Sequence, residues 1–242
     1  MCTVSFVPKE NSGFILTSNR DETVLRPSAL PILQYSVEGK QLYFPKDPKA
    51  GGTWIATDGN QRTVCLLNGG FEPHDMSPEK VYRKSRGLVV LDAFSYSDAK
   101  TFADEYDLSG IEPFTLILVE HTTELSLTEL RWDGTRLHHA VMDHSVPRIW
   151  SSVTLYPKAV RTNREELFTA LITKNGRPSG DEIMHFHRWA GEGDQRYDLV
   201  MKQGLKQTVS ICCFDFDQGM TSAYYHDLIT DERSKHLIYR IE

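Results

Sequence analysis

The chain opens with Met1-Cys2-Thr3-Val4-Ser5-Phe6-Val7, turns at residues 8–13, and continues with Phe14-Ile15-Leu16-Thr17-Ser18-Asn19-Arg20-Asp21-Glu22. Two short apolar runs separated by a turn are typical of a β-hairpin. A hairpin returns the chain beside its own start, so we expect Cys2 to lie next to Asn19, Arg20 and Asp21. The stretch therefore predicts a corner at which a thiol meets a charged cluster.

Removal of Met1 would give this corner a reactive nucleophile, because Cys2 would then carry a free amine and a thiol. An α-amino group has a pKa of about 7.7–8.0, so near neutral pH it can accept the proton of its own thiol. Asp21 could orient the amine, and Arg20 could favour the thiolate electrostatically. The alternative is a frayed terminus without a role, followed by a solvated turn. A cysteine at position 2 alone favours that alternative. Only the predicted pairing of Cys2 with the charged cluster favours a catalytic role.

A second corner is predicted where Asn68-Gly69-Gly70 follows an apolar run. Asp58-Gly59 lies between residues 53–57 and 62–67, which is a strong hairpin signal. Glycines permit unusual backbone angles and the close approach of a ligand. An asparagine at such a corner could donate its amide to a developing oxyanion. The residues alone equally allow a simple turn.

The order of these motifs resembles that of the NRDE family, which includes the transport and Golgi organisation protein 2 group. The matching motifs are Asn19-Arg20-Asp21-Glu22 after an N-terminal Met-Cys, Ala50-Gly51-Gly52-Thr53-Trp54, Leu67-Asn68-Gly69 and, more weakly, Trp150-Ser151-Ser152 with Tyr156-Pro157-Lys158. The resemblance implies an N-terminal-nucleophile (Ntn) hydrolase fold, in which two stacked sheets lie between two helical layers. The family is also similar to penicillin V acylases and bile-salt hydrolases, which use an N-terminal cysteine.

The resemblance also implies roles for individual residues in a hydrolase of non-peptide amides or thioesters. Its catalytic residues would be Cys2, Asp21, Arg20 and Asn68, and its substrate-binding residues Asn19, Glu22, Trp54 and Ser152. Two positions depart from these patterns. In the acylases the arginine lies three residues before the aspartate, whereas Arg20 directly precedes Asp21, and Ser152 stands where many NRDE members have asparagine. The alternative is a non-catalytic carrier of haem or of acyl-CoA or another lipid, with Trp54 and Trp150 lining its pocket.

The rest of the chain predicts strands and helices in separate blocks. We expect a loop over residues 23–40, strands at 42–44, 114–120, 123–132, 137–142, 149–153, 208–216, 220–226 and 237–241, and helices from Ser77, over 97–106, after Pro157 to Asn175-Gly176, and from Ser179. Hairpins predominate, so the sheets should be mostly antiparallel, with helices on their outer faces. The predicted fold is α+β, a four-layer αββα sandwich forming one domain over residues 1–242.

A third stretch repeats the letters of the first motif, since Asn163-Arg164-Glu165-Glu166 contains Asn-Arg followed by two acids. Thr162 and Glu165 have the spacing of a capping box. We therefore place this stretch at the start of a helix and give it no catalytic role.

Composition excludes several classes of function. A net charge of −6 without a basic cluster argues against a nucleic-acid partner. The N-terminal apolar run is broken at residues 8–11, and no stretch is long enough to span a membrane. The four cysteines, Cys2, Cys65, Cys212 and Cys213, have no metal or disulfide spacing, which favours a cytoplasmic protein with reduced thiols.

No cofactor or metal is expected. His185 and His187 would point nearly opposite ways on a helix, and no nucleotide-binding motif is present. The expected partner is a small-molecule amide or thioester, or a haem or acyl-CoA ligand in the carrier alternative. Pairing of sheets between two copies, as in a homo-oligomer, stays open.

Overall fold

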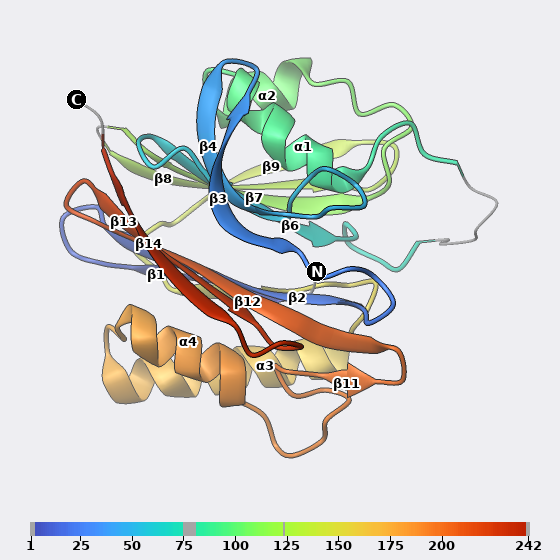
Figure 1. Ribbon diagram of the computed structural model, residues 1–242, viewed down its shortest axis with the longest axis vertical. Helices are drawn as coiled ribbons and strands as arrows, with labels where there is room; N and C mark the ends of the chain where they lie inside the picture. The colour runs from blue at the N-terminus through green and yellow to red at the C-terminus, as the bar shows by residue number, and fades with distance from the viewer. Residues whose placement is uncertain (1–2, 75–80, 123, 241–242) are drawn as a thin grey trace.

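Two stacked antiparallel sheets form the centre of the protein, in a computed structural model that describes residues 3–74, 81–122 and 124–240 (Figure 1). The first sheet has the order β10 (Arg148–Ser151), β1 (Thr3–Pro8), β2 (Phe14–Thr23), β12 (Lys206–Asp217), β13 (Met220–Asp227) and β14 (Arg233–Tyr239), with β11 (Lys202–Gln203) paired to β12. The second has the order β3 (Leu30–Val37), β4 (Lys40–Lys46), β5 (Ile55–Thr57), β6 (Arg62–Asn68), β7 (Phe114–His121), β8 (Leu125–Trp132) and β9 (Leu137–Met142).

Helices cover the outer face of each sheet (Figure 1). The second sheet is covered by α1 (Arg86–Asp92), the short 3-10 helix η1 (Ala93–Ser95) and α2 (Ala99–Glu105), and the first by α3 (Lys158–Asn175) and α4 (Gly180–Trp189). The order of layers is therefore helix, sheet, sheet, helix. The predicted α+β sandwich with mostly antiparallel sheets is confirmed.

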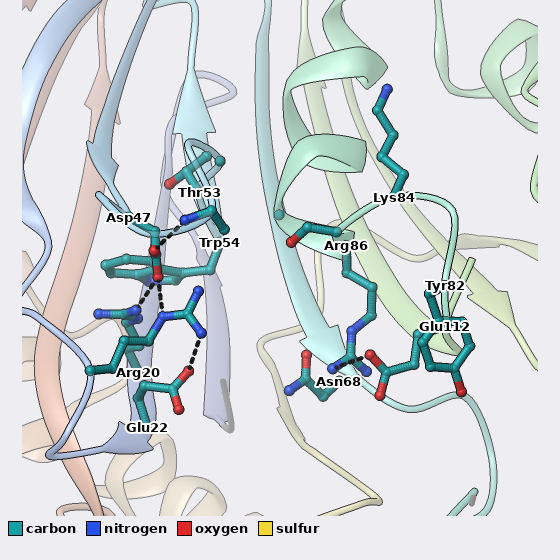
Figure 2. A pocket seen from close by; sticks show the side chains of 15 residues that line it. Arg20, Glu22, Asp47, Thr53, Trp54, Asn68, Tyr82, Lys84, Arg86 and Glu112 are labelled. Carbon is teal, nitrogen blue, oxygen red and sulfur yellow. Dashed lines mark hydrogen bonds and ion pairs between the residues drawn. The ribbon is translucent and has the colours of Figure 1, made fainter. Parts of the chain in front are cut away.

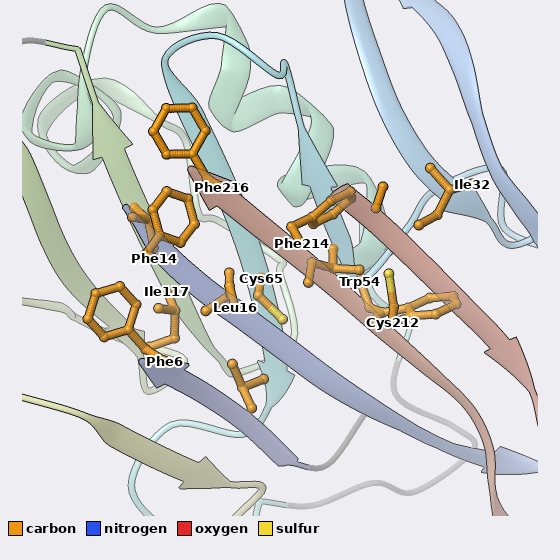
Figure 3. Close-up of a cluster of buried hydrophobic side chains, with 14 of the residues drawn as sticks. Phe6, Phe14, Leu16, Ile32, Trp54, Cys65, Ile117, Cys212, Phe214 and Phe216 are labelled. Carbon is orange, nitrogen blue, oxygen red and sulfur yellow. The ribbon is translucent and has the colours of Figure 1, made fainter. Parts of the chain in front are cut away.

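In the described residues the central strands bury side chains on both faces of each sheet, and three large apolar cores, with a small fourth cluster at Tyr156 and Met201, hold the layers together. The core between the sheets joins Phe6 and Leu16 of the first sheet to Cys65 and Ile117 of the second (Figure 3). A strand sends successive side chains to opposite faces. Ile15 accordingly lies in the other core, with α3 and α4. Burial of about 25 cal/mol per Å² of apolar surface makes these cores the main source of stability.

The adjacent cysteines illustrate the same alternation. Cys212 lies in the core between the sheets, whereas Cys213 lies in the core under α3 and α4. Both are fully buried, and neither forms a disulfide. Burial raises the pKa of Cys213 to about 12, so its thiol stays protonated near neutral pH. The two neighbouring thiols therefore face opposite sides of β12.

The loop predicted over residues 23–40 is wrong in its second half. β2 continues to Thr23, and β3 spans Leu30–Val37 although it contains Pro31. β3 is an edge strand, where a residue without an N–H is tolerated, and its register with β4 shifts between Leu30 and Ile32. Proline and glycine therefore mark an irregular edge here and not the absence of a strand.

One predicted helix start and one predicted helix cap need correction. Ser77 and Pro78 lie outside the described residues, and α1 begins only at Arg86 after a bridge between Lys84 and Ile111. α3 begins at Lys158, directly after Pro157, so Thr162 and Glu165 lie inside the helix and form no capping box. The capping box of α4 is present as its sequence indicated: Ser179 and Glu182 each accept the other's backbone N–H.

One buried histidine predicts a measurable sensitivity to acid. His121 is 3% exposed, its ring centroid lies 5.1 Å from that of Phe14 and 4.2 Å from that of Phe216, and neither ring nitrogen has a partner among the described residues. Burial lowers its pKa to about 4. The unfolded chain, with a pKa of about 6.5, therefore takes up the proton first, and stability falls as pH drops from about 6.5 towards 4.

We expect His121→Phe to remove this sensitivity. Between pH 7 and pH 5 the variant should lose about 1–2 kcal/mol less unfolding free energy than the wild type, measured by urea denaturation at both pH values. His139, exposed on β9, offers a control, since His139→Phe removes an imidazole from the surface. Equal pH dependence in the wild type and His121→Phe would contradict the assignment.

Candidate functional site

The first hairpin forms as the sequence predicts and sets the geometry of the site. β1 and β2 pair in the register Thr3 to Asn19 through Pro8 to Phe14. Cys2 lies outside the described residues, so its contacts with the charged cluster stay a prediction. The chain nevertheless links Cys2 directly to Thr3, whose partner Asn19 directly precedes Arg20 and Asp21.

The alternation of β2 divides the charged cluster between the two faces of the first sheet. Arg20 points between the sheets, where its guanidinium lies 4.7 Å from the ring centroid of Trp54. Asn19 and Asp21 point to the other face, towards the layer of α3 and α4, because their partners include His187 and Tyr156. Neighbouring residues of the motif therefore lie in two different environments, one on each face of the first sheet.

Arg20 lines a cavity of about 370 Å³ together with Glu22, Trp54 and Asn68, so four of the predicted site residues converge there (Figure 2). The other charged residues of its lining are Arg26, Asp47, Lys84, Arg86 and Glu112. Sequence reasoning missed all five. Arg86 is the first residue of α1, and the other four lie outside the helices and strands, where no motif marks them, so only the fold brings them together.

Asp47 organises one wall of this cavity. Its Oδ2 lies 2.5 Å from Arg20 Nη2 and 2.7 Å from Arg26 Nε. Burial alone would raise the pKa of Asp47, but hydrogen bonds from Arg26 and the Ala50 N–H, with the charges of both arginines, lower it. Burial lowers the pKa of Arg20, an effect that Asp47 opposes. The Arg20 side chain is only 5% exposed, so this wall presents a guanidinium held in a fixed orientation.

The opposite wall carries a second ion pair near Asn68 (Figure 2). Arg86 Nη2 lies 2.9 Å from Glu112 Oε2, and Arg86 Nη1 donates to the Pro113 carbonyl at 3.0 Å. Glu112 Oε1 also lies 3.0 Å from His74 Nε2. Each wall therefore pairs its guanidinium groups with carboxylates. A cavity so balanced favours a polar occupant over a purely apolar one.

Glycine 52 allows the helical layer to approach this cavity closely. A Cβ at Gly52 would lie 2.5 Å from the backbone carbon of Gly87, which is far inside van der Waals contact. The neighbouring Thr53 N–H donates to the Gly87 carbonyl at 3.0 Å. The Gly-Gly-Thr-Trp motif thus seats the start of α1 against the segment that carries Trp54 and leads into β5.

Ser152 supports Asn68 and does not line the larger cavity. Its Oγ donates to the Asn68 carbonyl at 2.7 Å and lies 2.9 Å from Thr154 Oγ1. Asn68, Ser152 and Trp150 line a second cavity of about 60 Å³. Asn68 therefore borders both cavities, and Ser152 fixes the backbone at that border.

The Asn19 side chain holds α4 in place. It is fully buried, its amide donates to the carbonyls of His187 at 3.1 Å and Leu199 at 2.7 Å, and its Oδ1 lies 2.7 Å from His187 Nδ1. Burial, with the charge of Arg164, lowers the pKa of His187 to about 3, so the ring is neutral and Nδ1 can donate to Asn19. Asn19 lines neither of the two cavities.

Asp21 is held by two hydroxyl groups. It is 6% exposed, and its carboxylate accepts from Tyr156 Oη and Thr208 Oγ1, both at 2.5 Å. Thr208 in turn accepts from the Met201 N–H at 2.9 Å, which fixes the hydroxyl. Asp21 is therefore a carboxylate with a defined orientation one strand away from Thr3.

Solved structures with this architecture include proteins with an Ntn-hydrolase fold. A mutant of conjugated bile acid hydrolase from Clostridium perfringens is 9% identical, covers 98% of this chain and 92% of its own, and has a TM-score of 0.63. The N-acylethanolamine-hydrolyzing acid amidase ortholog of Caenorhabditis elegans is 11% identical, covers 88% and 92%, and has a TM-score of 0.58. At these identities the likeness shows the fold, and the chain has an Ntn-hydrolase fold.

The sequence itself identifies the family. The profile of the Transport and Golgi organisation 2 family matches residues 1–194, and the chain belongs to that family. Comparison with curated protein sequences finds no match. None of the helices in the described part of the chain combines the length and the apolar character that a membrane crossing requires.

Proposed function

We propose that the chain is an N-terminal-cysteine hydrolase that cleaves a non-peptide amide or a thioester. The observation that carries this proposal is the register of the first hairpin, which pairs Thr3 with Asn19. It brings the residue after Cys2 to the strand that carries Arg20 and Asp21. The Ntn-hydrolase fold supports the proposal, because the neighbours named above include an amide hydrolase by their printed names.

In the proposed reaction Cys2 is the nucleophile. Its Sγ bonds to the substrate carbonyl carbon while the thiol proton passes to its own α-amine. The leaving amine or thiol then departs with that proton, which leaves a thioester on Cys2. Water hydrolyses this acyl-enzyme and restores the thiol. The cycle releases a carboxylic acid and an amine or a second thiol.

The other residues position the groups that react. Asp21 would orient the α-amine, since its own carboxylate is fixed by Tyr156 and Thr208. The Asn68 amide would donate to the oxyanion, an interaction that can be worth about 3–4 kcal/mol in a transition state. Ser152 would assist by fixing the Asn68 backbone.

The larger cavity would bind the polar part of the substrate. Arg20 presents fixed donors above Trp54, and Glu22, whose side chain is 30% exposed, offers an acceptor at the rim. With cationic and anionic groups on its walls, the cavity suits a hydrogen-bonding or zwitterionic group. We therefore expect this group to occupy the cavity while the scissile carbonyl lies near Asn68.

The carrier alternative predicts an aromatic pocket shared by Trp54 and Trp150. Trp54 lines the larger cavity, Trp150 lines the smaller one, and neither of these two cavities has both. No specific observation on the described residues favours a haem or acyl-CoA carrier over the hydrolase. Binding of either ligand without turnover is instead an outcome of the test below.

The test is hydrolysis of a panel of N-acyl amino acids, N-acyl amines and acyl thioesters by protein whose intact mass shows loss of Met1. We expect carboxylic acid to be released from at least one amide or thioester. A chain with an uncleaved N-terminal tag keeps the thiol but blocks the amine, so it should be inactive. Equal hydrolysis by the tagged chain, or binding of haem or acyl-CoA without any hydrolysis, would contradict the proposal.

A further inference from the structure

Arg164 lies at the centre of a buried network that the proposed reaction does not yet use. It is fully buried inside α3, although its sequence position indicated the start of a helix. Its guanidinium donates to the carbonyls of Tyr197 at 3.0 Å and Asp198 at 2.7 Å, and to the Thr3 hydroxyl. A buried charge is costly unless hydrogen bonds or an opposite charge compensate it.

Tyr156 connects this cation to the carboxylate of Asp21. The Arg164 guanidinium lies 3.8 Å from the centroid of the Tyr156 ring, while the hydroxyl at the other end of that ring donates to Asp21 Oδ2 at 2.5 Å. A cation over the ring face is attracted by the aromatic quadrupole, which holds the ring in place. The ring is 2% exposed, so water has little access to this arrangement.

We propose that Arg164 and Tyr156 form a positioning unit for the catalytic corner. Arg164 fixes the side chain of Thr3, the residue after the proposed nucleophile, and also the Tyr156 ring. Tyr156 fixes Asp21, the residue proposed to orient the α-amine. The unit thus fixes the position of β1, which follows the proposed nucleophile, relative to Asp21. The inference rests on the proposed function and gives a role to side chains outside the motif residues.

The unit acts on orientation, so its loss should slow the chemical step and leave binding unchanged. Misplacement of a reacting group by about 1 Å can cost as much as a hundredfold in rate. Tyr156→Phe keeps the ring against Arg164 and removes only the hydroxyl that contacts Asp21. The variant should therefore fold and bind substrate as the wild type does.

Tyr106 offers a closely matched control. Its hydroxyl donates to Asp92 Oδ2 at 2.6 Å, so Tyr106→Phe removes the same kind of hydrogen bond. Asp92 lies in α1 and Tyr106 caps α2, in the helical layer that covers the second sheet, whereas Asp21 lies on β2 of the first sheet and Tyr156 between β10 and α3. Any effect of a lost Tyr–Asp hydrogen bond on general stability should appear in both variants. An effect on the catalytic corner around Asp21 should appear only in Tyr156→Phe.

The experiment uses p-nitrophenyl acetate as the acyl donor, because it needs no knowledge of the natural substrate. Cys2 Sγ forms a bond to the acetyl carbon, the ester C–O bond breaks, and p-nitrophenolate leaves while the thiol proton passes to the α-amine. Release of p-nitrophenolate gives the acylation rate constant at saturation and the half-saturating concentration. Peptide mass spectrometry locates the acetyl group.

We expect Tyr156→Phe to lower the acylation rate constant about tenfold without changing the half-saturating concentration, while Tyr106→Phe acylates at the wild-type rate. Suppose that the wild type carries acetyl on Cys2. Equal acylation rates in the wild type, Tyr156→Phe and Tyr106→Phe, or equal losses in the two variants, would then overturn this inference and leave the proposed function standing. Acetylation of the wild type elsewhere, with none on Cys2, would instead overturn the proposed function. If Tyr156→Phe does not fold, Thr208→Val, which removes the other hydroxyl on Asp21, takes its place. A lower acylation rate constant than in Tyr106→Phe would then support the inference, and an equal one would overturn it.

Discussion

Cys2→Ala is expected to abolish hydrolysis of any amide or thioester that the wild type cleaves. Without the thiol there is no acyl-enzyme, and loss of a nucleophile costs a factor of at least about 10³ in rate. The measurement is kcat/KM for the best substrate of the panel, with circular dichroism to check that the variant is folded. Cys2 lies at the terminus, so folding should not depend on its side chain.

Cys65→Ala is the matched control for this prediction. Cys65 is fully buried between the sheets, and burial raises its pKa to about 12, so it supplies no thiolate near neutral pH. The control should keep its rate constant and lose only stability from the small cavity that it creates. Hydrolysis by Cys2→Ala at the wild-type rate would exclude the nucleophile that we propose.

Arg164→Met should cause the largest loss of stability of any single change considered. The substitution leaves the Thr3 hydroxyl and the carbonyls of Tyr197 and Asp198 without their donor in a buried site. Each buried acceptor left without a donor costs about 1–3 kcal/mol, so the three together should remove a large part of the stability of a typical domain. Urea denaturation of the variant and the wild type measures the difference.

Arg161 provides the comparison within the same helix. It lies one turn before Arg164 on α3 and is only partly buried. Arg161→Met makes the same chemical change and should cost less than about 1 kcal/mol. Equal losses in the two variants would mean that Arg164 contributes no more than an ordinary helical arginine.

Local signals predicted the fold well where they were strong. Asp58-Gly59 and the apolar runs around it gave the β5–β6 hairpin, and Ser179 with Glu182 gave the start of α4. The signals failed where one residue type serves two purposes. Pro31 lies in an edge strand and not in a loop, and Thr162 and Glu165 lie inside α3, which begins after Pro157 as predicted, and form no capping box.

The candidate site was only partly predictable, because it depends on contacts between distant segments. The motif around Arg20 and Asp21 predicted one corner, but a strand separates neighbouring residues onto opposite faces. Arg20 consequently joins Asp47, 27 positions further on, while Asp21 joins Tyr156, 135 positions further on. No local pattern encodes such pairs. Arg164 was assigned to a helix start for the same reason, although the fold buries it.

The central claim is that Cys2 has a thiol activated by its own α-amine. The most direct measurement is the rate of alkylation of each cysteine by iodoacetamide as a function of pH, read by peptide mass spectrometry. The account predicts a chain without Met1 in which Cys2 reacts first, with a midpoint below the ordinary thiol value of about 8.5. Cys65, Cys212 and Cys213, all fully buried, should stay unmodified while the protein is folded. Retention of Met1 on the protein from its own cells, or a Cys2 midpoint at or above that of an ordinary thiol, would contradict the account.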